Sequence, residues 1–236
     1  MTVMAAQLPT LESAPNTELL RSLRQLVRGL SALFWGLPIA LIICVQTAKT
    51  DILRTFGVVP PAAVTAWLCF GLWQLGAFQK QERVWTNALD RAKLLAIVDL
   101  GLSPFLYWWN QVPGQPFFTA IVSILAFSSL LFLSHLNLVL HRLSAMIPDE
   151  GLREETRHFT TFNRCFVIGI LLIGLVLIVI LRHPALLPPT LDFLSPRDPN
   201  SLWLIVFLVL LPLAMTMALL WKIKEVILDS IFGARH

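Results

Sequence analysis

Six apolar segments, separated by short polar stretches, dominate the pattern of this 236-residue chain. They cover residues 31–47, 58–78, 94–109, 117–140, 165–181 and 202–221. Several approach the ~20 residues that a helix needs to cross a bilayer core of about 30 Å. The first, third and fifth are shorter, so we expect their helices to extend into the flanking sequence. None alternates with the period of two typical of barrel strands, which leaves helices as the spanning structure.

Composition agrees with this pattern. With 56% hydrophobic and 14% charged residues, the chain has too little polar surface to cover a water-soluble core. We therefore predict an all-α fold, a polytopic integral membrane protein whose residues 31–221 form a six-transmembrane-helix bundle. The net charge of +4 comes from basic residues spread thinly among segment ends instead of forming a patch, so we expect a lipid bilayer and no nucleic acid as partner.

Residues 1–30 precede the first span as a mobile leader followed by an amphipathic helix over 17–30. Leucines recur at helical spacing on one face of that helix (19, 23, 26 and 30), and the opposite face carries Arg21, Arg24 and Arg28. One interpretation is an interfacial helix whose arginines contact lipid headgroups. The other is a solvated extension of the first span. The leader lacks the pattern of a cleaved secretory signal.

Basic residues give the orientation of the bundle. Six spans place both termini on one side, and 14 of the 18 Lys and Arg residues flank the spans on that side. By the positive-inside rule, both termini are then cytoplasmic, and we expect a multi-pass protein of a bacterial cytoplasmic membrane. Aromatic residues should mark both interfaces: Tyr107, Trp108, Trp109 and Trp203 outside, and Trp35, Trp85 and Trp221 inside.

Three further segments complete the domain organisation. Residues 141–164 form a charged cytoplasmic hairpin, which is a solvated helix or a docking surface for a protein partner. Residues 182–201 form an outer loop with five prolines, which stop helices and remove donors, so we expect an extended cap. Residues 222–236 form a cytoplasmic tail.

One polar layer crosses the predicted bundle. Asp99 lies inside the third apolar segment, and an ionisable group in hydrocarbon is costly enough to suggest a functional site. At about 1.5 Å per residue, Asp99 and His135 both lie about 7 Å below the cytoplasmic edge. Gln74 and Asn137 lie at similar depth. The layer is either a proton- or ion-responsive site or a set of hydrogen bonds that holds the helices together.

Enzymatic chemistry has little support in the sequence. Asp99, His135 and Ser103 could suggest a serine hydrolase, but Ser103 precedes a proline and no glycine-framed nucleophile is present. No set of His, Cys and carboxylate residues has metal-ligand spacing, and the chain has no Walker loop, dinucleotide fingerprint or HExxH. We therefore predict no catalytic residue, no metal and no cofactor.

The leading functional hypothesis is a non-enzymatic membrane-embedded subunit or scaffold that contacts protein partners or lipid. The alternative is a small-solute or ion transporter or channel that uses the layer of Asp99 and His135. Because the span centres are almost purely apolar, that alternative needs a homo-oligomer to line a pathway with the third and fourth spans. A membrane enzyme acting on lipid ranks third.

Overall fold

The computed structural model describes residues 14–78, 82–146, 150–182 and 199–232. This part of the chain is helical and contains no strand, which confirms the all-α class. Its elements are α1 (Ala14–Lys49), the 3₁₀ turn η1 (Arg54–Phe56), α2 (Val59–Leu75), α3 (Arg83–Leu102), α4 (Phe105–Gln111), α5 (Pro116–Met146), α6 (Glu150–Arg182) and α7 (Pro199–Phe232). The N-terminal 13 residues and most of the predicted outer loop lie outside the described residues.

Each of the six predicted spans falls largely within helical residues, but the helix ends differ from the predicted ones. The amphipathic segment and the first span form one uninterrupted helix, α1. The predicted cytoplasmic hairpin divides between the ends of α5 and α6, and α7 continues into the predicted tail. Helices extend because amphipathic flanking sequence continues the backbone hydrogen bonding after the apolar run ends.

Prolines mark several helix boundaries. Two prolines stand in the first turn of α2, and α5 and α7 each begin at a proline. Proline is tolerated there because its missing N–H has no helical partner in the first turn. Pro104 separates α3 from α4 and so divides the predicted third span. Pro38 and Pro212 instead lie inside α1 and α7.

Two described segments are long and apolar enough to cross a membrane. They are Arg21–Lys49 and Pro116–Met146, whereas α2 is apolar but has 17 residues. By length and composition alone, these helices suggest membrane association. The number of crossings and the orientation remain predictions.

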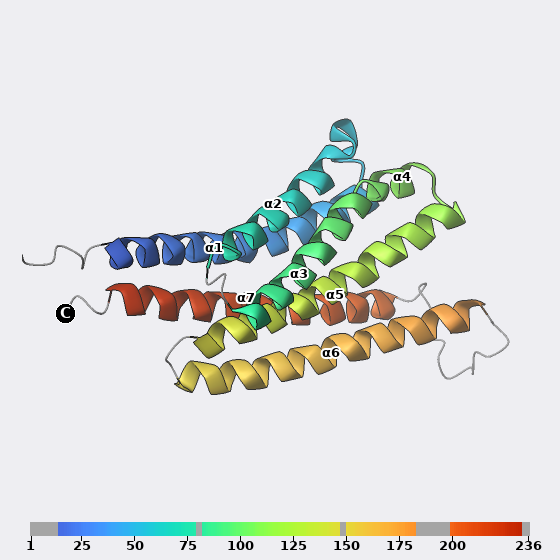
Figure 1. Cartoon of the computed structure of the whole chain (residues 1–236). Coiled ribbons are helices and arrows are strands. Elements are labelled where there is room, and N and C mark those ends of the chain that lie inside the picture. Colours follow the sequence, from blue (N-terminus) through green and yellow to red (C-terminus); the bar gives the residue numbers. More distant parts are fainter. Residues whose placement is uncertain (1–13, 79–81, 147–149, 183–198, 233–236) are drawn as a thin grey trace, which may run out of the picture.

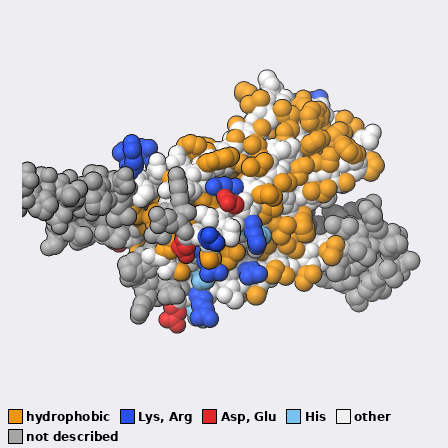
Figure 2. All heavy atoms as spheres, in the orientation of Figure 1, with side chains coloured by type: hydrophobic (Ala, Val, Ile, Leu, Met, Phe, Trp, Pro, Cys, Tyr) orange, Lys and Arg blue, Asp and Glu red, His pale blue; other side chains and the backbone are white. Residues whose placement is uncertain are grey.

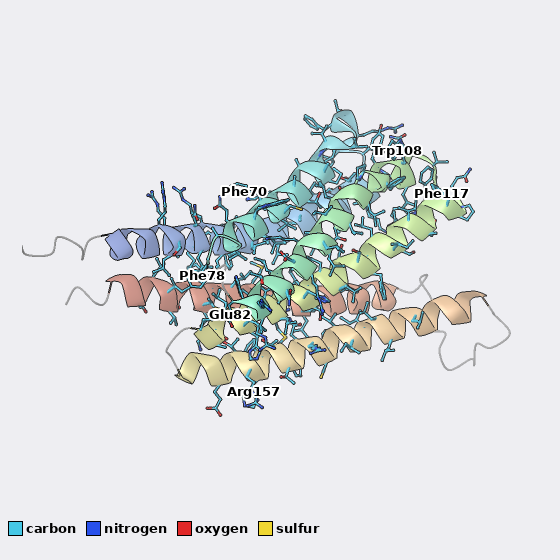
Figure 3. All side chains as sticks on the ribbon, in the orientation of Figure 1. Phe70, Phe78, Glu82, Trp108, Phe117 and Arg157 are labelled. Atoms are coloured by element: carbon cyan, nitrogen blue, oxygen red, sulfur yellow. The ribbon has the colours of Figure 1, made fainter. Side chains whose placement is uncertain are left out.

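The helices pack as an elongated bundle (Figure 1). α1 packs against α2 and α7, α3 packs against α2 and α5, and α6 packs against α5 and α7. The start of α1 and the end of α7 lie at the same end of the bundle in Figure 1. Figure 3 shows Glu82 and Arg157 toward that end, and Trp108 and Phe117 at the opposite end.

Glycines allow α1 and α2 to approach closely. A Cβ atom on Gly29 would lie 2.9 Å from the backbone oxygen of Gly71, and one on Gly71 would lie 3.1 Å from Leu33 Cγ. Small residues let helix backbones pack tightly where lipid provides no hydrophobic drive between helices. Leu26 and Leu30 of the predicted amphipathic segment are 1% and 0% exposed in this core, so its apolar face is occupied by protein.

Trp85, a predicted member of the inner aromatic belt, does not reach the surface of the protein. Trp85 is 0% exposed, and its indole nitrogen has no hydrogen-bond partner among the described residues. α3 begins at Arg83, and Trp85 lies one turn before Leu89 on the buried face of that helix. Trp35 and Trp221 are exposed, as the belt requires.

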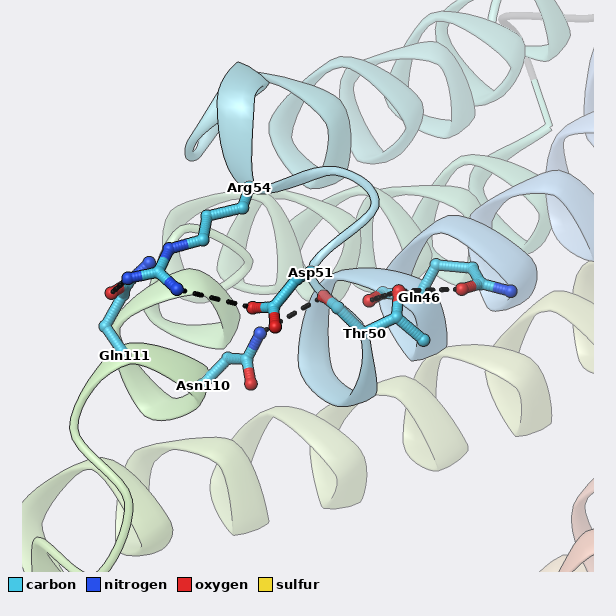
Figure 4. A network of polar contacts seen from close by, with 6 residues as sticks. All are labelled: Gln46, Thr50, Asp51, Arg54, Asn110 and Gln111. Carbon is cyan, nitrogen blue, oxygen red and sulfur yellow. Dashed lines mark hydrogen bonds and ion pairs between the residues drawn. The ribbon is translucent and has the colours of Figure 1, made fainter.

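A polar clasp joins the end of α1, η1 and α4 (Figure 4), at the end of the bundle opposite the start of α1 (Figure 1). Arg54 donates a hydrogen bond to Gln111 Oε1 at 3.0 Å and lies 3.6 Å from the Asp51 carboxylate. Asn110 Nδ2 donates to the Thr50 carbonyl at 3.2 Å. The two ion-pair partners are mostly exposed, so the clasp sets the helix ends with little expected contribution to stability.

Candidate functional site

A cavity of about 330 Å³ lies among α1, α2, α3, α5 and α7. Leu106 of α4 also lines it. Small residues on three helices create it. α1 contributes Ala40, Cys44 and Ala48 at successive turns, α3 contributes Ala96, and α5 contributes Ala126. Because short side chains face one another across these helices, they do not fill the space between the backbones. Leucine, valine and phenylalanine side chains form most of the remaining wall.

Asp99 supplies the carboxylate of this cavity. It lies on the buried face of α3, one turn after Ala96, and is 7% exposed. The Ser128 and Ser129 hydroxyls of α5 lie beside it. However, neither Asp99 Oδ1 nor the Ser128 hydroxyl has a hydrogen-bond partner among the described residues. A buried carboxylate oxygen without a partner is costly, and such an exception requires an explanation.

Two other polar groups in the cavity wall, the hydroxyls of Thr65 and Ser103, make hydrogen bonds. The Thr65 and Ser103 hydroxyls lie 3.2 Å apart and share a hydrogen bond between α2 and the end of α3. Thr65 also donates to the Pro61 carbonyl, and Ser103 lies 3.0 Å from the Leu100 carbonyl. Asp99 therefore differs from Thr65 and Ser103, because its Oδ1 is buried without a hydrogen-bond partner among the described residues.

The structure does not join the four residues of the predicted layer by hydrogen bonds or ion pairs. His135 is partly exposed, and its Nδ1 lies 3.0 Å from the Leu131 carbonyl of its own helix. Gln74 packs at the contact of α1 and α2, where its Cβ lies 3.1 Å from the Cβ position of Gly29. Asp99 thus faces serines of α5, while His135 and Gln74 make different contacts.

Asn137 belongs to a second polar site, a junction of α5, α6 and α7. Asn137 Nδ2 donates to the Leu133 carbonyl at 2.9 Å and to Thr216 Oγ1 at 3.0 Å. Asn163 Nδ2 donates to the same Thr216 oxygen at 3.2 Å, and the Thr216 hydroxyl donates to the Pro212 carbonyl at 2.7 Å. A hydroxyl has one donor and two acceptor positions, so Thr216 uses its full capacity here. We call this trio the Thr216 junction.

The predicted headgroup contacts lie on the surface of α1. Arg21, Arg24 and Arg28 are all exposed, while the opposite face of the helix is buried. This placement is compatible with a lipid headgroup contact and also with simple solvation. The contact with lipid remains a prediction.

Ser103 shares its hydrogen bond with Thr65, and His135 lies against its own helix backbone, so the hydrolase grouping of Ser103, His135 and Asp99 is not hydrogen-bonded together. Among the described residues, no three His, Cys, Asp or Glu side chains form a group that could hold a metal ion.

Four polar residues at these sites were not predicted from the sequence: Ser128, Ser129, Thr216 and Asn163. The pair of adjacent serines in an apolar run was the available signal for the first two. Thr216 stands one turn after Pro212, and a hydroxyl at that spacing commonly bonds to the backbone carbonyl four residues earlier.

Comparison with protein-family models, with curated proteins and with solved structures finds no match to this chain.

Proposed function

We propose that this chain is a non-enzymatic membrane-embedded subunit or scaffold that contacts lipid and protein partners. The observation that carries the proposal is the large number of apolar side chains exposed on the outer faces of the helices. They include Trp35 and Ile42 of α1, Trp67, Phe70 and Trp73 of α2, Ile124 and Phe127 of α5, and Leu172 and Leu175 of α6. Soluble monomers rarely expose contiguous apolar surface on this scale, and lipid or a protein partner is the natural cover.

Charge distribution supports the same proposal. On the face shown in Figure 2, charged side chains gather toward the end where α1 begins, and hydrophobic side chains cover most of the opposite part. A membrane protein separates its surface in this way along the bilayer normal. The proposed arrangement has six crossings, with both termini and the charged start of α6 in the cytoplasm.

Alkaline carbonate extraction of membranes tests the embedding. We expect the chain to stay in the membrane pellet, because several apolar helices would anchor it. Release of the chain into the supernatant would refute the proposal.

A cysteine placed in the predicted outer loop, such as Ser195→Cys, should react with an impermeant thiol reagent in intact cells. Asp229→Cys, near the end of α7, should react only after permeabilisation.

A transporter or channel is the second candidate, and the observation favouring it is the buried carboxylate in the wall of the cavity. It requires that the purified chain alone moves an ion or small solute across liposomes. It also requires that Asp99→Asn abolishes the flux while the protein stays folded. Such a result would replace the scaffold proposal. Absence of Asp99-dependent flux in a panel of monovalent cations, protons and amino acids would favour the scaffold.

A further inference from the structure

We propose that the cavity at Asp99 binds a single-chain amphiphile whose head group donates a hydrogen bond, through either a hydroxyl or an amine. The inference rests on the proposed membrane function, because it names the class of lipid-like ligand that the chain would hold. Three properties of the cavity support it: its size, a buried acceptor without a partner among the described residues, and its opening toward the apolar surface.

The size fits a ligand better than isolated waters. One water needs roughly 10–15 Å³ of cavity volume, so the cavity of about 330 Å³ accommodates on the order of twenty water-sized groups. Ligand pockets begin at about 300 Å³. The aliphatic wall offers such waters few hydrogen bonds, whereas an alkyl chain needs none. An alkyl chain of about a dozen carbons matches both the space and the wall.

Asp99 defines the chemistry of the head group. Among the described residues, Oδ1 has no hydrogen-bond partner and no Lys, Arg or His lines the cavity. The protein therefore places an acceptor in the cavity without supplying a cation to balance it. A ligand that donates a hydrogen bond would give Asp99 Oδ1 a partner, and an ammonium head group would also balance the negative charge of the Asp99 carboxylate. A carboxylate or phosphate head would instead meet a like charge and is disfavoured.

The opening of the cavity lies at the outer apolar surface. Val45 of α1 and Ala126 of α5 line the cavity and are also exposed, Val45 by 50%. Ile42 and Phe127, next to them on the outside, are exposed apolar side chains. A ligand dissolved in the hydrocarbon layer could therefore enter between α1 and α5 without crossing water.

Photoaffinity labelling of the full chain in phosphatidylcholine nanodiscs tests the proposal. The probes are dodecylamine and dodecanol with a diazirine in the chain, and the matched control is the same chain without a head group. We expect both or one of the headed probes to label peptides of α1, α3 and α5 at the cavity at least tenfold more than the headless chain. Equal labelling by the headless chain would overturn the role of Asp99.

Asp99→Leu should reduce the specific labelling at least tenfold. The matched control is Asp90→Leu on the same helix, where the carboxylate is exposed and pairs with Lys93, and it should label like the wild type. Asp99→Asn separates the two head groups, because an amide oxygen still accepts a hydrogen bond but carries no charge. Loss of amine labelling with alcohol labelling retained shows that the amine needs the charge of Asp99, whereas retention of both shows that a hydrogen-bond acceptor is enough. Unchanged labelling in Asp99→Leu would contradict the proposal.

A second variant covers the case in which Asp99→Leu does not fold. Ala126→Trp should block the opening and lower labelling, while Ala120→Trp, an exposed position of α5 away from the cavity, should not. Equal labelling of these two variants would also contradict the proposal. Release of the chain into the supernatant on carbonate extraction would refute the membrane proposal itself. Labelling of an embedded chain that does not depend on Asp99 would refute only the ligand proposal.

Discussion

The cavity at Asp99 and the Thr216 junction place buried polar groups at helix contacts in different ways, although Asn163 Oδ1 of the junction also has no hydrogen-bond partner among the described residues. At the junction, the protein supplies partners for the Asn137 amide nitrogen and uses every hydrogen-bonding position of Thr216. In the cavity, the Asp99 carboxylate has an oxygen without a partner, next to open space. The junction therefore resembles a structural contact. The cavity resembles a site kept open for a molecule that the chain does not contain.

The largest expected effect is at the junction. Thr216→Val keeps the shape of the side chain but removes the acceptor shared by two asparagines, so a loss of about 2 kcal/mol in unfolding free energy is expected. Reversible unfolding in mixed micelles measures it. The control is Thr161→Val on the exposed face of α6, where the hydroxyl bonds only to the backbone carbonyl of Arg157. A change below ~0.5 kcal/mol at Thr216 would remove the contrast between the two sites.

Asp99→Leu should act in the opposite direction. It removes a buried carboxylate whose Oδ1 has no partner among the described residues and adds apolar volume to the cavity, so we expect a gain of about 1 kcal/mol in the ligand-free protein. The same unfolding assay measures it, beside Asp90→Leu. A loss of 2 kcal/mol or more would show that Asp99 supports the fold, and the cavity would then be structural.

The helix bundle could be predicted from the sequence, but the fate of its polar groups could not. Apolar run lengths located the helices, and counting residues along them placed Asp99 and Asn137 at similar depth. Counting does not show which neighbour each side chain meets. Asn137 meets Thr216, 79 positions away in the chain, and Asp99 meets serines of α5. A cavity is harder still, because it depends on several small side chains facing one another across helices.

Ser128→Ala should have a smaller effect. Its hydroxyl is buried without a hydrogen-bond partner, so its removal should change the unfolding free energy by less than ~0.5 kcal/mol in the ligand-free protein. With ligand bound, the variant tests whether Ser128 assists Asp99, because amphiphile labelling would then fall severalfold. A stability loss above ~1 kcal/mol would instead assign Ser128 a structural hydrogen bond.

The smallest effect is expected at the polar clasp. Arg54→Ala removes an exposed ion pair and an exposed hydrogen bond, so the unfolding free energy should change by less than ~0.5 kcal/mol. Unfolding in mixed micelles measures this change, and the Arg54→Ala value is the exposed reference for the two buried sites. A loss as large as that of Thr216→Val would show that exposure does not separate these polar groups by energy.

Native mass spectrometry of the gently extracted protein tests most directly whether Asp99 is held for a ligand. We expect the wild type and Asp90→Leu to retain one bound amphiphile per chain, with a hydroxyl or amine head identified by fragmentation. Asp99→Leu should lose that mass while remaining folded. An identical set of bound lipids in all three proteins would contradict the account and leave the cavity as a packing defect.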